Sequence, residues 1–278
     1  GPEFVITPED YPQVYAIKDN GTGLRKLTDF PYFSFSDYES RASPDGKKMV
    51  LVSKKDGNKE IYTFDLSTSV LTRLTSNSSY ASNEDYSPDW SPDGQEVAFI
   101  SNRHQSSSGR SSETYIMNKD GTNQRKIILP SSLLQHGSPR FSPDGQKISL
   151  DATTTGSAYH IYTVKKDGTG LTQLTTGNSL NIQSTWSPDG SKLAFVSDRD
   201  GNREIYVIDA NGTNINRLTN NSAIDSEPFW LPNGKIGFIS DRNGYNQLHL
   251  MNPDGSGVTR IVTKNNSNDR TPGYLPPQ

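Results

Sequence analysis

The sequence contains no cysteine among its 278 residues, which excludes a disulfide framework, a thiolate metal site and a cysteine nucleophile. It also lacks the Gly-x-Ser-x-Gly motif of serine hydrolases. No apolar run approaches the roughly 20 residues that a membrane-spanning helix needs, so we expect no membrane insertion. A net charge of −3 and a pI of about 5.8 give no support for a nucleic-acid partner.

Hydrophobic residues are scarce as well, at 31% of the chain, with a mean hydropathy of −0.74. The 13 Tyr, 10 Phe and 3 Trp nevertheless argue against a disordered chain. Many short strands joined by polar turns would produce this composition. Gly1–Phe4 is typical of a remnant of protease cleavage and cloning, so the lack of a visible secretion signal tells us nothing about the compartment.

An internal repeat predicts the architecture. Ser-Pro-Asp-Gly occurs at 43–46, 91–94, 142–145 and 187–190, with Leu-Pro-Asn-Gly at 231–234. The Asp or Asn positions of these turns are 44 to 51 residues apart. Each unit reads as four short strands separated by Gly-containing turns, and four-stranded units of this length in tandem are typical of propeller blades.

The two ends of the chain complete each other. Residues 11–28 align with 245–262 of the last full unit but lack its first strand, and the tail Asn268–Gln278 matches that strand. We therefore predict an all-β, six-bladed propeller of four-stranded antiparallel blades over residues 5–278, closed by the C-terminal strand joining the N-terminal three. The predicted blades cover residues 5–28 with 269–278, 37–75, 85–128, 136–175, 181–219 and 225–262.

The repeats resemble a known family. The stretches "SEPFWLPNGKIGFISDRNG" and "STWSPDGSKLAFVSDRDGNREIYVIDANGTNINRLT" are similar to the repeats of TolB-type six-bladed propellers, a WD40-like class, and the resemblance covers essentially the whole chain. The separate N-terminal domain of TolB has no counterpart here. The resemblance implies a periplasmic or extracellular location and a binding role at one mouth of the channel. In TolB the partner received there is the peptidoglycan-associated lipoprotein Pal.

Candidate binding residues lie on the first strand of each unit, which should run along the central channel with alternate residues facing it. Eight positions before each turn Asp or Asn stand Asp37, Asp85, His136, Asn181, Asp225 and Asp269. Farther along the same predicted face stand Glu39, Glu227, Arg41 and Arg140. The alternation predicts a largely acidic ring at one channel mouth.

Two kinds of ligand would suit such a ring. Oxygen ligands favour a hard cation such as Ca²⁺, with Asp37, Asp85, Asp225 and Asp269 as its ligands, and no cofactor is otherwise required. A basic peptide side chain is the other kind. The alternative is a polar, water-filled channel that binds no ligand, in which the aspartates cap local backbone groups.

The leading hypothesis is a non-catalytic, monomeric binding module that recognises a protein or peptide, such as a cell-envelope lipoprotein. The four histidines fall at different repeat positions and no nucleophile is visible, so we do not expect an enzyme. Two alternatives stay open: a carbohydrate-binding or enzyme-associated propeller that uses the same face, and a structural spacer. The three Trp share one repeat position and are predicted to pack between blades. Aromatic residues in 29–38 could border the ring or fold onto their own blade.

Overall fold

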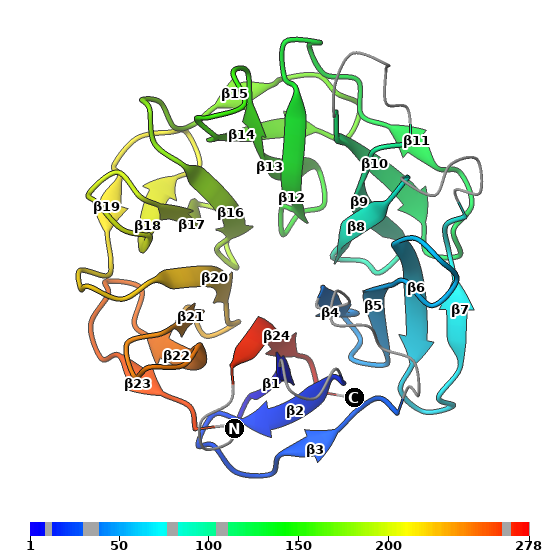
Figure 1. The fold of residues 1–278 in the computed structure, drawn as a ribbon, viewed down its shortest axis with the longest axis horizontal. Helices are drawn as coiled ribbons and strands as arrows, with labels where there is room; N and C mark the ends of the chain where they lie inside the picture. The colour runs from blue at the N-terminus through cyan, green and yellow to red at the C-terminus, as the bar shows by residue number, and fades with distance from the viewer. Residues whose placement is uncertain (9–12, 30–38, 77–82, 104–110, 263–267, 278) are drawn as a thin grey trace.

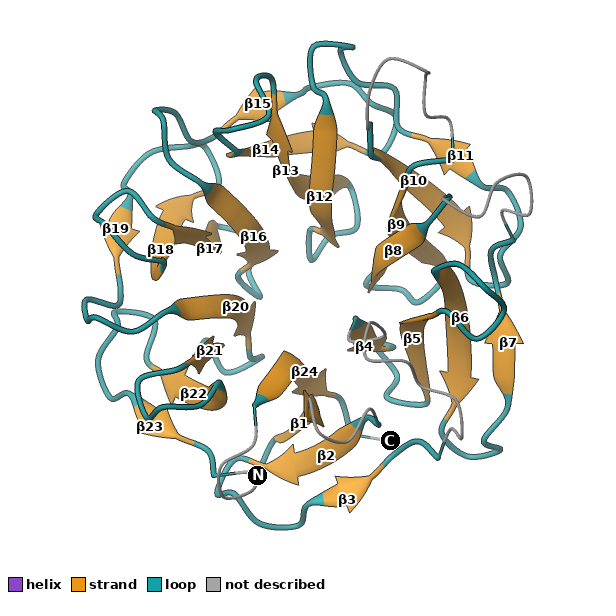
Figure 2. Cartoon of the chain, in the orientation of Figure 1, coloured by secondary structure: helices purple, strands orange, loops and turns teal. Residues whose placement is uncertain are grey.

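A computed structural model describes residues 1–8, 13–29, 39–76, 83–103, 111–262 and 268–277. Within these ranges the chain forms six four-stranded antiparallel sheets and no helix (Figures 1 and 2). The sheets stand around a common axis as the blades of a propeller, as predicted. Since the described part has no helix, it also has none that could span a membrane.

Blade 1 combines both ends of the chain, and blades 2 to 6 follow in sequence order. The first three blades are β24 (Asp269–Leu275), β1 (Glu3–Pro8), β2 (Tyr15–Lys18), β3 (Arg25–Lys26); β4 (Ser40–Ala42), β5 (Lys48–Ser53), β6 (Glu60–Asp65), β7 (Leu71–Arg73); and β8 (Asp85–Trp90), β9 (Glu96–Ser101), β10 (Glu113–Asn118), β11 (Arg125–Lys126). The last three are β12 (Gln135–Phe141), β13 (Lys147–Thr153), β14 (His160–Lys165), β15 (Thr172–Gln173); β16 (Asn181–Trp186), β17 (Lys192–Ser197), β18 (Glu204–Asp209), β19 (Asn216–Arg217); and β20 (Asp225–Trp230), β21 (Ile236–Ser240), β22 (Gln247–Met251), β23 (Thr259–Arg260).

The Ser-Pro-Asp-Gly phrase forms the turn between the two inner strands of a blade. In blade 2 the Ser43 hydroxyl donates to Asp45 Oδ1 at 2.6 Å and accepts from the Lys48 amide at 2.9 Å. Gly46 closes the turn by donating its backbone amide to the Ser43 carbonyl in a hydrogen bond. Its φ is positive, at 69°, a conformation that glycine adopts without steric cost. The same hydroxyl–carboxylate bond recurs at 91, 142 and 187, so the repeat encodes its own turns.

The ring closes as the sequence predicts. β24 pairs antiparallel with β1, Phe4 opposite Tyr274 and Thr7 opposite Arg270, and Figure 1 shows these two strands side by side. One boundary is corrected: Glu3 and Phe4 belong to β1, and Phe4 is fully buried, so the propeller begins two residues before the predicted start at residue 5. Strand pairing and burial of the Phe4 ring give these residues a structural role.

The core is distributed over the junctions between neighbouring blades. One cluster, for example, joins Val50 and Ile61 of blade 2 to Trp90, Phe99 and Tyr115 of blade 3. Trp90 is 7% exposed and Trp186 8% exposed, each donating its indole N–H to a carbonyl of the preceding blade. The prediction that the tryptophans pack between blades is therefore confirmed, and stability depends on every junction being present.

Removing residues 269–278 tests closure. The truncated chain should leave β1 as an open edge and uncover Phe4, lowering the melting temperature by about 10 °C or more. A chain shortened only by residues 277–278 is the control, because it keeps β24 whole. Equal melting temperatures for the 269–278 deletion and the full chain, measured by calorimetry, would contradict closure by β24.

Candidate functional site

A cavity of about 390 Å³ lies on the propeller axis, lined by residues on or beside all six innermost strands, β4, β8, β12, β16, β20 and β24 (Figure 1). We call it the central channel. Its charged and polar lining comprises Glu39, Ser40, Arg41, Ser87, Ser138, Arg140, Gln183, Glu227 and Arg270. The predicted channel residues Glu39, Arg41, Arg140 and Glu227 are thus brought together, and each is partly exposed. The lining carries charges of both signs.

A backbone irregularity repeats around this lining. Ser87, Ser138, Gln183 and Glu227 occupy the same blade position, and all four have positive φ, between 46° and 57°. At each of them the pairing register with the next strand shifts, which defines a β-bulge. Left-handed backbone is uncommon outside glycine, and such strain persists only where the surroundings hold it in place. At Ser87, Gln183 and Glu227 a side chain of the preceding blade does so.

Those neighbours hold the bulge through its amide group. The Ser87 amide donates to the Glu39 carboxylate of the preceding blade, and the Glu227 amide donates to Gln183 Oε1 at 3.0 Å. The Gln183 amide donates to Asp151 Oδ1 at 3.1 Å. Ser138 of that blade has a shorter side chain than Glu39 or Gln183, and Asp151 supplies the acceptor instead. A chain of inter-blade hydrogen bonds therefore fixes the channel lining.

Arg41 and Arg140 of the lining form a charged group with Asp89. Asp89 Oδ2 accepts the Phe141 amide at 2.9 Å, and burial raises the pKa of Asp89 while Arg140 and Arg41 oppose that rise. Burial, and then Arg140, lower the pKa of Arg41 to about 10. Arg41 therefore remains charged at neutral pH, and the group presents two guanidinium ions for one carboxylate.

The predicted ring of aspartates at the channel mouth is wrong in its placement. Asp85, Asn181, Asp225 and Asp269 are each 0% exposed, and His136 is 6% exposed. The sequence argument counted alternate residues along the strand, but the bulge lies between Asp85 and Asp89 and breaks that alternation. These side chains consequently lie in the blade junctions. Asp37 lies outside the described residues, as do the aromatic residues at 32, 33 and 35.

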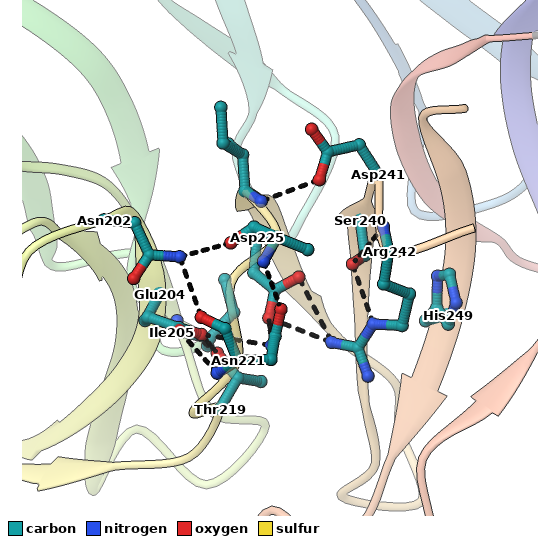
Figure 3. Close-up of polar contacts among 12 residues, drawn as sticks. Asn202, Glu204, Ile205, Thr219, Asn221, Asp225, Ser240, Asp241, Arg242 and His249 are labelled. Atoms are coloured by element: carbon teal, nitrogen blue, oxygen red, sulfur yellow. Dashed lines mark hydrogen bonds and ion pairs between the residues drawn. The ribbon is translucent and has the colours of Figure 1, made fainter. Parts of the chain in front are cut away.

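Figure 3 shows one junction, between blades 5 and 6. Both carboxylate oxygens of Asp225 accept from Arg242 Nη2, at 3.1 and 2.9 Å, and Asn221 Nδ2 donates to Oδ2 at 2.9 Å. Asn221 in turn bonds Glu204, which also accepts from Thr219 and Arg217. Asp225 is thus a neutralised structural anion rather than an open ligand.

The arginine recurs at the same place in two other blades. Arg103 pairs with Asp85 at 2.9 Å, and Arg199 donates to Asn181 Oδ1 at 2.7 Å. Each guanidinium also stacks over aromatic rings of its own blade, with Arg103 4.8 Å from the Tyr115 centroid. Burial raises the pKa of Asp85 to about 6 against the opposing effect of Arg103. The Ser-x-Arg signal for this arrangement is visible in the sequence, at 101–103, 197–199 and 240–242, but sequence reasoning missed it.

Of the four predicted metal ligands, Asp85, Asp225 and Asp269 lie within the described residues. Across the described ranges, no three His, Asp or Glu side chains lie close enough to share a metal ion. Asp85 and Asp225 belong to separate junctions, each paired with its own arginine. Binding of Ca²⁺ stays a prediction.

Sequence reasoning also missed Asp151. It pairs opposite Gly137 in blade 4, where the corresponding residues of three other blades are Ile100, Val196 and Ile239. Asp151 is 5% exposed, and burial raises its pKa to about 6. An acid in an aliphatic repeat position was visible in the alignment of units and could have been noticed.

With six four-stranded blades around a central channel, the chain is a six-bladed β-propeller. The sequence model of the TolB beta propeller domain matches residues 4–133, 110–203 and 199–276, and the chain belongs to that family. It is 32% identical over 167 residues to the protein TolB homolog of Chlorobium luteolum, covering 59% of this chain and 35% of that relative. It is 42% identical over 52 residues to the Tol-Pal system protein TolB of Ruthia magnifica subsp. Calyptogena magnifica, covering 19% and 12%.

The chain thus spans about a third of the first relative's length. Among solved structures, TolB from Acinetobacter baumannii superposes with a TM-score of 0.80 at 24% identity, covering 99% of this chain and 67% of that one. The nidogen/laminin complex gives 0.77 at 12% identity, covering 99% and 98%. The tricorn protease gives 0.71 at 17% identity, covering 95% and 27%. At these identities the structural likeness establishes the fold alone.

Replacing Arg242 by Met tests the junction. The change leaves the Asp225 carboxylate buried beside Asn221 without a cation, which should lower the free energy of unfolding by about 3–5 kcal/mol. Arg199→Met is the matched control: it loses a similar stacked guanidinium, but its partner Asn181 is neutral, so it should cost about 1–2 kcal/mol. Urea unfolding measures both, and equal losses would contradict the role of Asp225. The double variant D225N/R242M should recover most of the difference.

Replacing Asp151 by Asn tests the cost of its charge. Because the folded pKa of about 6 lies above the ordinary value of 3.8, the folded chain binds the proton more tightly than the unfolded chain does. Stability from this group is therefore present below pH 3.8 and lost as the pH rises through about 6. D151N should be about 1–3 kcal/mol more stable than the native chain at about pH 7.5, with no gain below about pH 4. Urea unfolding that shows no gain at about pH 7.5 would contradict this.

Proposed function

We propose that the chain is a non-catalytic binding module that recognises a protein or peptide partner at the central channel, in the periplasm or outside the cell. The observation that carries this proposal is the charged lining contributed by all six blades and held by inter-blade hydrogen bonds. A lining that costs strained backbone at four positions has a fixed shape, and fixed polar groups confer specificity.

The chemistry of the lining favours a polypeptide guest. Glu39 and Glu227 offer acceptors, while Arg41, Arg140 and Arg270 offer donors. A cavity of about 390 Å³ accepts a few side chains rather than a folded domain, so a partner would insert a loop or terminus of mixed charge. Arginine is also the cation that most often anchors protein interfaces.

The family favours a cell-envelope partner. One relative is a Tol-Pal system protein, and we propose that the partner here is a lipoprotein of the Pal type. Enzyme-associated propellers are also among the structural neighbours, including the puromycin hydrolase and an oligogalacturonate lyase. Among the described residues that line the channel, however, there is no histidine to act as a general base for a serine nucleophile. Carbohydrate stacking on Trp90 or Trp186 is disfavoured by their burial.

A double substitution in the channel tests the proposal. E227Q/R270Q removes one charge of each sign, so net charge is kept, and it should weaken binding of the soluble domain of a Pal-type lipoprotein at least about tenfold, since charge-assisted bonds are lost. Isothermal titration calorimetry measures the affinity. Unfolding curves should show both proteins folded.

The control is D254N/K119Q, which makes the same change in net charge at two exposed turns. Asn occupies the position of Asp254 in two other blades, at Asn20 and Asn211, and caps its turn there in the same way. The control should bind like the native chain. Undiminished affinity of E227Q/R270Q would rule out the channel as the recognition site, and no binding by the native chain would rule out the lipoprotein.

A further inference from the structure

A second cavity, of about 630 Å³, lies at the junction of blades 3 and 4, beside the central channel. We call it the junction pocket. The residues that matter in its lining are Tyr86 and Glu84 of blade 3, His136 and Asp151 of blade 4, Tyr159 before β14, and Lys59 of blade 2. Asp151 and His136 are nearly completely buried, while the other four are partly exposed.

Blade 4 departs from the repeat at this pocket. The junction residue that is Asp85 or Asp225 elsewhere is His136, and Thr154 stands where Arg103 and Arg242 pair with those aspartates. Blade 4 therefore lacks both partners of the internal ion pair. It has instead an acid on the second strand, Asp151, one residue before Ala152, which pairs with His136. Other blades bury an aliphatic side chain at the position of Asp151, such as Ile100 in blade 3.

A neighbouring glycine makes room for this acid. A Cβ on Gly137 would lie 2.5 Å from Asp151 Oδ2, so any larger residue would clash with the carboxylate. In blades 3 and 5 the corresponding residues are Tyr86 and Ile182. The two departures, glycine on one strand and aspartate on its partner, therefore depend on each other.

The fold uses Asp151 as a hydrogen-bond acceptor but does not need its charge. Its Oδ1 accepts the Gln183 amide at 3.1 Å, which an asparagine oxygen would do equally well. Burying a carboxylate that lacks a bound cation costs free energy. Among the described residues, no Lys, Arg or His makes an ion pair with Asp151; the charge of Arg140 favours the ionised carboxylate without pairing with it, and Arg140 donates to the Pro139 carbonyl.

No other described group of the pocket forms an ion pair with this carboxylate. Glu84 pairs with Lys54 at 3.8 Å, and Lys59 lies over the Tyr86 ring at 5.7 Å. His136 Nδ1 accepts the Thr114 amide at 3.2 Å, and burial lowers the pKa of His136 to about 4, so the imidazole is neutral. The Lys59 contact also demonstrates that the Tyr86 face attracts a cation.

We propose that the junction pocket binds one ammonium or guanidinium group, with Asp151 as its counter-ion and the rings of Tyr86 and Tyr159 as its walls. The cation is a lysine or arginine side chain of the partner protein. The pocket's chemistry stands independently of the proposed function, whereas the source of the cation rests on it. A partner that inserts one segment into the channel would place a basic side chain beside it.

Small probes test the pocket without the lipoprotein. Nα-acetyl-lysine amide and Nα-acetyl-arginine amide carry the two cations, Nα-acetyl-norleucine amide is the uncharged control, and putrescine represents a free diamine. Binding is followed through the ring resonances of His136, identified among the four histidines by its replacement with Gln. At least one basic amide should shift these resonances saturably, and norleucine amide should not.

Three variants complete the design. D151N keeps the Gln183 bond but removes the charge, and it should weaken the basic probe at least about tenfold. G137A keeps the charge but displaces the carboxylate, and it should weaken the same probe. D167N, on an exposed turn, makes the same charge change as D151N and should bind normally. Melting curves verify that each variant is folded.

The outcomes separate the two proposals. Equal binding by D151N, equal binding of norleucine amide, or no saturable shift with any cation would overturn the pocket. Binding of putrescine but of neither amino-acid amide would keep the cation site and overturn the partner as its source. Since the channel proposal is tested with the lipoprotein and the E227Q/R270Q variant, failure of either proposal appears in its own measurement.

Discussion

The structure depends on one repeated contact between neighbouring blades. In five of the six innermost strands, the first residue, or in β12 the second, donates its backbone amide to a carbonyl of the preceding blade, just before that blade's third strand. The donor and acceptor pairs are Asp85 with Lys59, His136 with Ser112, Asn181 with Tyr159, Asp225 with Arg203 and Asp269 with Asn246. This contact fixes each blade against the next and pulls the first side chain of the strand into the junction, where water is excluded.

The orientation of the channel-facing residues depends on the next segment of the innermost strand. After two residues it bulges, with the third residue in the left-handed region, as at Ser87 and Glu227. The bulge turns that residue toward the axis and directs its amide to an acceptor on the previous blade. The junction and the channel are therefore two consequences of one short strand segment, one serving stability and the other available for recognition.

The fold could be predicted because its signals are local and repeated. Asp45 and Gly46 carry their turn chemistry wherever they stand, and the match of the tail to a first strand required only alignment. The site was predicted only in part. Glu39, Arg41, Arg140 and Glu227 were assigned to the channel, but Asp85 and Asp225 were assigned there too, because strict alternation cannot foresee a bulge. Bulge geometry depends on acceptors from another blade, which no single repeat contains.

The departures of one blade from the repeat carry more functional information than the features shared by all. Asp225 recurs as Asp85 because the junction uses it with an arginine, whereas Asp151 has no such use for its charge. The proposed cation site gives this buried charge a role that the junctions do not. Blade 4 therefore distinguishes one sector of an otherwise regular ring.

In the proposed function the bulged layer, and not the first residue of each strand, meets the partner. Because the chain has no native cysteine, maleimide labelling of single-cysteine variants tests it directly. Cysteine in place of Ser138, which lines the channel, should label readily and be protected by saturating lipoprotein. Cysteine in place of Asn181, the first residue of β16, which is 0% exposed, should label slowly with or without it. Equal labelling at both positions, or no protection of position 138 by a bound partner, would contradict the account.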